Sequence, residues 1–286
     1  MTSAEIQEHA ARLAAETNEF NERAHGLGLG DVGDFYWYHC VDLPHGLTTP
    51  GVYDFRETVR RFPFPADMRG MRVLDVGSAT GFFAFEFERR GADVVSVELD
   101  SLESLDRFPG QPIEPVLAQI ERMMTSESTA PRNFTAGEMY FNLLEGPFSF
   151  CHKLLGSRVR RCYSSVYALT PEKVGGAGFD LIFMGDILLH TINPLQALAA
   201  VTPLCAGALV LSQVIPDNAE DRPAMLYVGG DDPRRDDVSW WWPNKSCLTQ
   251  MLKKLGFRAV EQTGSHIATM RTSGYQNERA IFQATR

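Results

Sequence analysis

Residues 73–83 are Val-Leu-Asp-Val-Gly-Ser-Ala-Thr-Gly-Phe-Phe, an apolar run that includes an acidic residue and is followed by a turn of small residues. Residues 82–90 then have the pattern of a helix that stops at Gly91, a favoured C-terminal cap. Residues 94–97 are a second valine-rich run, and Glu98 closes it. The stretch therefore predicts a strand, a turn, a helix and a second strand, the layout that holds a nucleoside in an open α/β sheet.

The small residues of the turn and the carboxylate after the second run are the candidate ligand-binding groups. Gly77, Ala79 and Gly81 let the backbone approach a ligand closely. Glu98, 21 residues after Gly77, can accept hydrogen bonds from both hydroxyls of a ribose. A tight turn in an α/β domain that binds no nucleoside is the alternative interpretation.

A dinucleotide-binding turn is a further interpretation of the same stretch. Pyrophosphate binding favours Gly-x-Gly-x-x-Gly, with small residues where the helix meets the phosphates. Phe82 and Phe83 stand at the start of the predicted helix instead. Their rings suit a sulfonium and an amino-acid moiety better than two phosphates.

Residues 73–83 resemble motif I of the class I S-adenosylmethionine-dependent methyltransferases, with Ala79 in place of the usual middle glycine. The resemblance implies S-adenosylmethionine as the cofactor. It also implies a cofactor site at the turn and at the ends of neighbouring strands, made of Asp75, Gly77, Ser78, Ala79, Gly81, Phe82, Glu98, Leu99, Val166, Tyr167, Met184 and Gly185.

Composition and charge limit the classes of protein to which the chain belongs. Its 286 residues are 44% hydrophobic and 22% charged, as in an ordinary globular protein. The formal net charge of −9 argues against broad affinity for nucleic acid, which depends on a positive surface. No run reaches the ~18 apolar residues that a membrane span needs, so no membrane association is expected.

Cysteine usage and the N-terminus point to the cytoplasm. The five cysteines are scattered and include no C-x-x-C pair, which is typical of reduced thiols and makes a zinc site unexpected. The N-terminus has no signal-peptide pattern. No metal is predicted, because Asp217, Asn218 and Asp221 in one acidic loop match no recognised ligand spacing.

Residues 1–66 are expected to form a helix and an aromatic lid segment ahead of the main domain. Residues 3–23 carry apolar side chains at helical spacing. Residues 35–43 alternate like a strand and bring four aromatic residues and a histidine together, and residues 54–61 favour a helix. A lid over the cofactor is one interpretation of this segment, and a plain β-hairpin that caps the core is the other.

Residues 101–147 are an expected insertion after the second strand. Connections from a strand to the next helix are normally short, whereas a helix-like run with Val116, Ile120, Met123 and Met124 on one side and a polar loop at 126–133 intervene here. Because the carboxyl ends of the strands border the ligand crevice, we expect a cap that faces the substrate. A contact within a homodimer is the alternative.

The rest of the chain supplies further strands and helices of one sheet. Strand patterns occur at 159–164, 179–184, 207–215, 258–260 and 280–284, and helix patterns at 148–155 and 248–255. With the first two strands they predict an α/β fold, a doubly wound, seven-stranded, mostly parallel sheet of the Rossmann-like methyltransferase type. The fold would carry an N-terminal extension and the helical insertion, and residues 67–286 would be the S-adenosylmethionine-binding domain.

From about Trp37 onward the chain is similar to the tRNA (mo5U34) methyltransferase-like family of bacteria, in stretches at 154–157, 179–183, 188–190, 243–257 and 274–280. The tRNA enzymes of that family hold a carboxylated S-adenosylmethionine with a Tyr after the fourth strand, where this chain has Leu189. A buried carboxylate without a partner is costly, so ordinary S-adenosylmethionine is expected. Trp37-Tyr38-His39 resembles the bacterial relatives that methylate small molecules or sugars.

Methyl transfer to a hydroxyl requires the protein to position the acceptor and take its proton. His39 and His190 are the candidate bases, because imidazole suits this role near neutral pH. Asp186 could orient a histidine or bind a sugar hydroxyl, and a structural role is the alternative for both histidines. The candidate substrate-binding residues are Trp37, Tyr38, Trp241 and Asn244.

Three functions follow from these patterns. The first is O-methylation of a small-molecule or glycan acceptor, which the acidic chain and the aromatic residues favour. The second is a tRNA wobble-uridine methyl- or carboxymethyltransferase, which needs a basic groove. The third is a domain that binds the nucleoside without catalysis.

Overall fold

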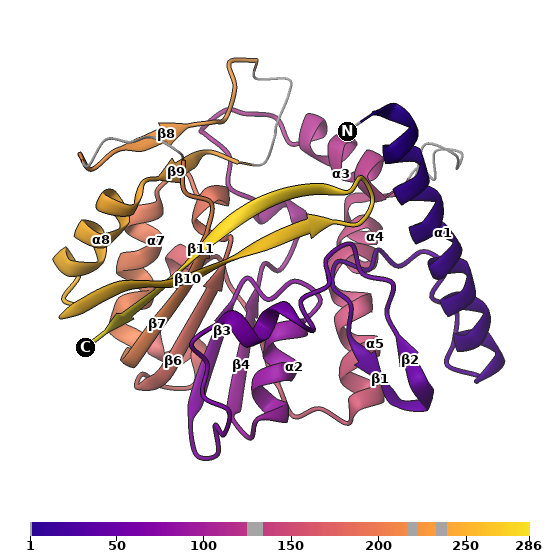
Figure 1. Ribbon diagram of the computed structural model, residues 1–286, viewed down its shortest axis with the longest axis horizontal. Coiled ribbons are helices and arrows are strands. Elements are labelled where there is room, and N and C mark those ends of the chain that lie inside the picture. Colours follow the sequence, from indigo (N-terminus) through magenta and orange to yellow (C-terminus); the bar gives the residue numbers. More distant parts are fainter. Residues whose placement is uncertain (1, 125–133, 217–221, 233–238) are drawn as a thin grey trace.

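The computed structural model describes residues 2–124, 134–216, 222–232 and 239–286, and its centre is a seven-stranded sheet (Figure 1). The strand order is β10-β11-β7-β6-β3-β4-β5. Five strands are parallel, β3 (Arg72–Val76), β4 (Asp93–Glu98), β5 (Arg160–Tyr163), β6 (Phe179–Gly185) and β7 (Cys205–Gln213), and two are antiparallel, β10 (Ala259–Met270) and β11 (Tyr275–Thr285). The predicted doubly wound, mostly parallel sheet of seven strands is confirmed.

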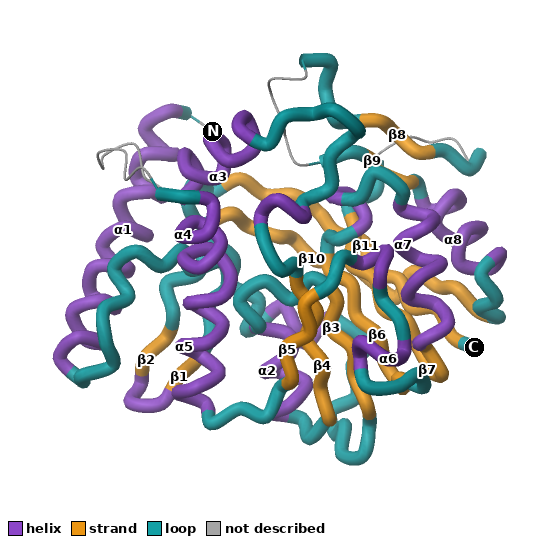
Figure 2. Tube along the Cα trace, turned by 180° about the vertical axis from the view of Figure 1, so that it is seen from behind, coloured by secondary structure: helices purple, strands orange, loops and turns teal. Residues whose placement is uncertain are grey.

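Helices cover both faces of the sheet, as the opposite views of Figures 1 and 2 show. Because side chains alternate along a strand, Val73 of β3 packs on one face and Leu74 and Val76 on the other. The first face is covered by α2 (Phe82–Arg89) and α5 (Gly146–Leu155), and the second by α6 (Pro171–Val174), α7 (Pro194–Val201) and α8 (Lys245–Lys254).

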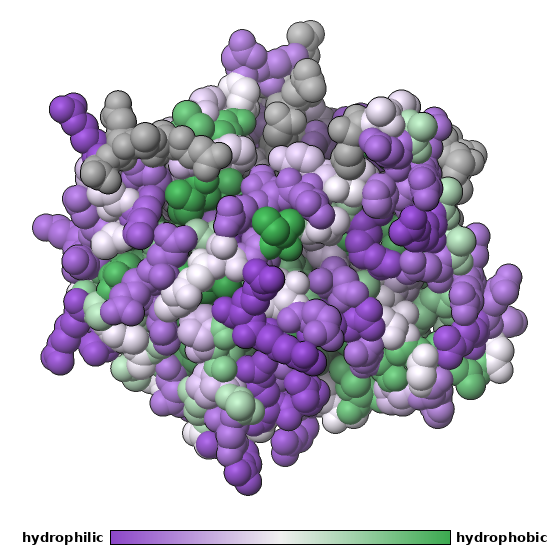
Figure 3. Space-filling model, viewed as in Figure 1, coloured by the Kyte–Doolittle hydropathy of each residue, from purple (hydrophilic) through white to green (hydrophobic). Residues whose placement is uncertain are grey.

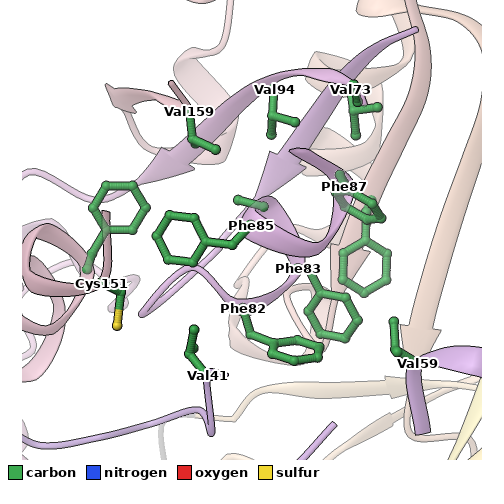
Figure 4. Packing of buried hydrophobic residues seen from close by; sticks show 14 of the residues in the cluster. Val41, Val59, Val73, Phe82, Phe83, Phe85, Phe87, Val94, Cys151 and Val159 are labelled. Carbon is green, nitrogen blue, oxygen red and sulfur yellow. The ribbon is translucent and has the colours of Figure 1, made fainter. Parts of the chain in front are cut away.

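Helix α2 joins the sheet to the N-terminal segment. Its phenylalanine rings lie between Val73 and Val94 of the sheet and Val41 and Val59 of the segment (Figure 4). All six residues from Phe82 to Phe87 are buried. The helix that begins at the glycine turn is therefore fixed by core packing on two sides, and the turn with it.

The N-terminal segment is less regular than its pattern predicts. Helix α1 (Ser3–Gly26) is confirmed and begins with a capping box of Thr2 and Glu5. The predicted strand at 35–43 is wrong for most of its length, because only Asp42–Leu43 forms a strand, β1, which pairs with β2 (Leu47–Thr48) across a short turn at Pro44–Gly46. His39 adds a single isolated bridge to Tyr53. Residues 54–61 form only a short 3-10 helix at Thr58–Arg61, since Asp54 accepts hydrogen bonds from Arg56 in place of a helical turn.

The insertion after β4 builds a small core of its own. Its elements are a 3-10 turn at Leu102–Ser104, α3 (Glu114–Met124), α4 (Ala136–Tyr140) and a π-helical turn, η4 (Phe141–Glu145), that runs into α5. Leu102, Val116, Ile120, Met139 and Leu143 pack together. Met123 does not belong to this core, as it is 45% exposed. The loop predicted at 126–133 lies outside the described residues.

The C-terminal hairpin is longer than the sequence patterns predict. Only Ala280–Thr285 of β11 pairs with β7, so Tyr275–Arg279 and the facing part of β10 continue past the carboxyl end of the parallel strands. The hairpin curves across the molecule towards α1 (Figure 1). A separate pair, β8 (Met225–Tyr227) and β9 (Trp241–Pro243), was not predicted.

On the face shown in Figure 3 hydrophilic residues predominate, and hydrophobic ones are scattered among them. Within the described parts of the chain, no helix has the length and apolar character to cross a membrane. The predicted division into residues 1–66 and 67–286, with a cap at 101–147, stays a prediction.

Candidate active site

The turn between β3 and α2 lies at the carboxyl edge of the sheet and is shaped by its glycines. Gly77 has φ 72° and Gly81 has φ 91°, conformations that side chains disfavour. A Cβ at Gly77 would lie 1.9 Å from Cδ1 of Ile187. The segment after β6 thus touches the turn directly, and only glycine permits that approach.

Ala79 is held in the left-handed region, at φ 47°, by two charged side chains. Its backbone N–H donates to Oε2 of Glu98 at 2.8 Å, and its carbonyl accepts from Nη2 of Arg161 at 3.1 Å. Arg161 also donates to the hydroxyls of Ser78 and Ser96 and lies over the ring of Phe148. Arg161 was not predicted, because its place in β5 gives no local signal of this contact.

Glu98 is buried, and both of its oxygens accept backbone N–H groups, from Ala79 and from Leu99 at 2.9 Å. A carboxylate has about four acceptor positions, so two remain for the hydroxyls of a ribose. Leu99 is in turn fixed by the insertion, because the hydroxyl of Tyr140 donates to its carbonyl at 2.8 Å. The predicted pair of turn and carboxylate is brought together as expected.

Asp75 lies beneath the turn and is 1% exposed. Burial, against the opposing cation of Arg161 and with a smaller contribution from the charge of Glu98, raises the pKa of its carboxyl to about 7. Its Oδ2 has no hydrogen-bond partner among the described residues. A buried carboxylate oxygen of this kind suits a cationic or hydrogen-bond-donating part of a ligand.

The remaining predicted cofactor residues lie on the neighbouring strand ends. Val166 and Tyr167 are half-buried in a 3-10 turn after β5, and the Tyr167 hydroxyl donates to Asp106 of the insertion. Met184 is buried at the end of β6, followed by Gly185. These positions border the crevice where open α/β sheets bind ligands.

Asp186 follows β6 and is paired with a residue from the other end of the chain. Nε of Arg279, on β11, donates to Oδ2 of Asp186 at 2.6 Å. Burial raises the pKa of the Asp186 carboxyl, while Arg279 and His190 lower it. Asp186 has φ 52°, which Asp tolerates better than most residues.

Tyrosines surround this ion pair. The Asp186 and Arg279 charges act in opposite directions on the phenol pKa values of Tyr38 and Tyr53, both of which burial raises. The two rings lie 5.1 Å apart. The sequence analysis missed Tyr53 and gave Arg279 no role, because a contact between residues 93 positions apart leaves no local pattern.

His39 lies against Thr80 of the turn. Its Nδ1 lies 3.3 Å from the hydroxyl of Thr80, and the rings of Phe55, Phe82 and Phe83 surround it. Burial lowers the pKa of its imidazole to about 3. A neutral, 5% exposed imidazole in this place packs the turn against the N-terminal segment.

The other predicted residues divide between the site and the core. His190 is exposed on the 3-10 turn after Asp186, and Trp241 donates from Nε1 to the carbonyl of Ile192 at 3.0 Å beside that turn. Trp37 is 3% exposed among Phe20, Phe35 and Phe150 in the core. Asn244 is 3% exposed and caps α8 through Cys247. The structure thus brings Tyr38, Asp186 and His190 together, and Trp37 and Asn244 lie apart from them.

A family described as a methyltransferase domain matches residues 52–262. The chain belongs to this methyltransferase family. The match spans the turn, the insertion and the segment after β6, and so includes Asp75, Glu98 and Asp186, whereas Tyr38 and Arg279 lie outside it.

Solved structures resemble this methyltransferase in fold. The N-terminal domain of EvdMO1, determined in the presence of S-adenosylhomocysteine and D-fucose, has 16% identity and a TM-score of 0.51, with 94% of this chain and 97% of that one covered. A Burkholderia thailandensis 1,6-didemethyltoxoflavin N1-methyltransferase has 16% identity, a TM-score of 0.46 and coverage of 76% and 72%. The magnesium protoporphyrin IX methyltransferase of Synechocystis PCC 6803 has 13% identity, a TM-score of 0.45 and coverage of 77% and 71%. No curated protein sequence matches this chain.

The predicted activity class, methyl transfer, is confirmed by the family. The predicted cofactor is S-adenosylmethionine. The described residues fit that molecule. Glu98 has acceptor positions left for the ribose, and Oδ2 of Asp75 lacks a partner among the described residues.

Proposed function

We propose that this methyltransferase transfers a methyl group from S-adenosylmethionine to a hydroxyl of a small molecule or sugar. The observation that carries the proposal is the position of Asp186. Met184 of β6 pairs with Val76 of β3, so Asp186 stands beside the glycine turn at the same edge of the sheet. Its Oδ1 has no hydrogen-bond partner among the described residues. A buried carboxylate oxygen without a partner among the described residues therefore lies next to the cofactor turn.

The cofactor is held by the residues of the turn and the strand ends. S-adenosylmethionine supplies an activated methyl group, whose transfer to an oxygen also releases a proton. Glu98 takes the ribose hydroxyls, Asp75 lies on the side of the amino-acid moiety, and Val166 and Tyr167 border the adenine. These residues orient the donor, and orientation supplies much of the rate in a two-substrate reaction.

Asp186 is proposed as the general base. Burial raises the pKa of its carboxyl from the ordinary value, which makes it a stronger base than an exposed aspartate. Arg279 keeps the carboxylate in place and ionised. His190 lies within electrostatic range and can pass the proton to solvent, whereas His39, held neutral against the turn, is proposed to have a structural role.

A small-molecule or sugar acceptor is favoured over nucleic acid. The chain has a formal net charge of −9, and the position at which the tRNA enzymes carry a Tyr is occupied by Leu189, which is 6% exposed. The solved structure of the EvdMO1 domain with D-fucose supports a sugar only through its shared fold. The resemblance to the tRNA (mo5U34) methyltransferase-like family and a possible homodimer stay predictions.

The test is methyl transfer from radiolabelled S-adenosylmethionine to a panel of sugars, phenols and bulk tRNA. We expect transfer to a hydroxyl compound, and a fall of about 10²- to 10⁴-fold in kcat for Asp186→Asn, the usual contribution of a general base. Affinity for S-adenosylhomocysteine should be unchanged in that variant. Glu278→Gln, an exposed carboxylate on β11, is the matched control and should behave as the wild type.

Transfer to tRNA alone, or full activity of Asp186→Asn, contradicts the proposal. Binding of S-adenosylhomocysteine without transfer to any panel member would favour the non-catalytic function instead.

A further inference from the structure

The ion pair of Asp186 and Arg279 is only half satisfied. Nε of Arg279 and Oδ2 of Asp186 are joined at 2.6 Å. Oδ1 of Asp186 and Nη1 of Arg279 are both buried, and neither has a hydrogen-bond partner among the described residues. Leaving a buried charged donor or acceptor unpaired is unfavourable. Two such atoms on one ion pair point to a ligand that completes them.

Oδ1 of Asp186 and Nη1 of Arg279 need different hydrogen-bond partners. An ionised carboxylate only accepts hydrogen bonds, and a guanidinium only donates them. Each unpaired atom is two covalent bonds from the atom of its own side chain that forms the Asp186–Arg279 hydrogen bond. Both unpaired atoms therefore lie within reach of one ring-sized ligand. The Asp186 side chain is 29% exposed and that of Arg279 13%, so the pair reaches the surface even though its two unpaired atoms are buried.

The opposite charges of Asp186 and Arg279 favour a neutral ligand. The pair carries no net charge, so an anion that approaches Arg279 meets Asp186, and a cation that approaches Asp186 meets Arg279. Hydroxyl groups both donate and accept, and two neighbouring hydroxyls satisfy both atoms without adding charge. The rings of Tyr38 and Tyr53, which lie 5.1 Å apart, are near enough to the pair for its charges to act on both phenols.

We propose that the acceptor is a neutral diol, with the methylated hydroxyl donating to Oδ1 of Asp186 and a neighbouring hydroxyl accepting from Nη1 of Arg279. This inference rests on the proposed function and narrows it. In the reaction the acceptor oxygen forms a bond to the methyl carbon while the bond from that carbon to sulfur breaks and its electron pair stays on sulfur. The proton of the hydroxyl passes to Oδ1 of Asp186 and then to water. Arg279 is thus a residue that determines specificity for the second hydroxyl.

The diol has two chemical sources, a sugar and a catechol, and the experiment has an arm for each. The sugar arm compares methyl α-D-mannopyranoside with its monodeoxy analogues, and the catechol arm compares catechol with phenol. For the wild type we expect removal of the hydroxyl next to the methylated position to lower kcat/KM about tenfold or more, the loss of a hydrogen bond to a charged group. Removal of a distant sugar hydroxyl should have little effect. Methylated product in the sugar arm identifies the diol as a sugar, and product in the catechol arm identifies it as a catechol.

Arg279→Met tests the assignment to this residue. We expect the variant to turn over parent and deoxy compounds at nearly equal kcat/KM, with unchanged affinity for S-adenosylhomocysteine. Arg279→Lys keeps the charge and serves as the second variant if Arg279→Met fails to fold. We expect it to retain part of the discrimination between parent and deoxy compounds. Arg258→Met, an exposed arginine at the far end of the same hairpin, is the matched control.

Equal kcat/KM for parent and adjacent-deoxy compounds in the wild type overturns the diol inference, as does full discrimination in Arg279→Met. Absence of transfer to both parents overturns it too. Transfer to other hydroxyl compounds of the wider panel would still leave the proposed function standing, so the two failures are distinguishable.

Discussion

Single residues of the glycine turn decide whether the cofactor site forms. Ala79 adopts a left-handed conformation that costs an ordinary residue roughly 1–2 kcal/mol. Glu98 and Arg161 hold its N–H and carbonyl from two sides. Glu98 therefore both shapes the turn and keeps acceptor positions for the ribose, so that backbone strain at Ala79 and cofactor binding depend on the same carboxylate.

Gly77→Ala is expected to destabilise the protein by about 2–4 kcal/mol, from a strained positive φ and from overpacking against Ile187. Gly70→Ala is the matched control, since Gly70 has φ 80° but open space around its Cβ, and it should cost only about 1–2 kcal/mol. Urea unfolding of both variants measures the difference. Equal losses would show that the close approach of Ile187 does not matter.

His39 predicts a specific loss of stability in acid. Burial lowers its pKa from 6.5 to about 3, so between these values the unfolded chain binds a proton that the folded protein does not. Its contribution to the free energy of unfolding is constant above pH 6.5 and falls by about 1.4 kcal/mol per unit as the pH drops below that value.

Between pH 6.5 and 5 the wild type should therefore lose about 2 kcal/mol more stability than His39→Gln, as measured by urea unfolding. His25→Gln, at an exposed position of α1, should follow the wild type. A His39→Gln variant with the same acid dependence as the wild type would contradict a buried, neutral imidazole.

At the scale of elements, the β10–β11 hairpin extends past the carboxyl end of β7 and brings Arg279 to Asp186. Its turn is tied to the N-terminal segment, where Arg271 donates to the carbonyl of Gly51 at 2.8 Å and pairs with Glu16 of α1. A Cβ at Gly274 would lie 2.4 Å from the His9 ring. The element that supplies Arg279 is thus held over the sheet by contacts at its tip.

Arg271→Gln should loosen this arrangement. We expect faster amide hydrogen exchange in residues 265–280 and 37–53, and a higher KM for the acceptor with unchanged affinity for S-adenosylhomocysteine, because the hairpin carries Arg279 and not the cofactor residues. Arg60→Gln removes an exposed ion pair as the control. Unchanged exchange in both segments would show that the tip contacts do not hold the hairpin.

Elements differed in how far the sequence predicted them. The strands β3 and β4 and helix α2 were predicted closely, because their periodicity and caps are local. Residues 35–43 were predicted as a strand, yet their backbone bonds go to distant partners, such as Tyr36 N–H to the carbonyl of Asn142 and His39 N–H to Thr80. The length of β10 and β11 also escaped prediction, since nothing in their patterns marks where pairing with β7 ends.

At the scale of the molecule, the sequence predicted the half of the site that a single strand–turn–helix–strand unit builds. Asp75, Glu98 and the turn lie within 24 residues and face one another as expected. The other half is assembled from parts far apart in sequence, with Tyr38 from the N-terminal segment, Asp186 after β6 and Arg279 from β11. Only the folded sheet brings these together, so Arg279 could not be assigned from a pattern.

The account depends on Glu98 as the residue that binds the ribose, and calorimetric titration of S-adenosylhomocysteine tests it most directly. The wild type should bind, and Glu98→Ala should bind about 10- to 150-fold more weakly, the loss expected for a hydrogen bond to a charged group. Asp93→Asn, an exposed carboxylate at the start of the same strand, should bind as the wild type does. A wild type that does not bind S-adenosylhomocysteine, or a Glu98→Ala variant with undiminished affinity, would contradict the account.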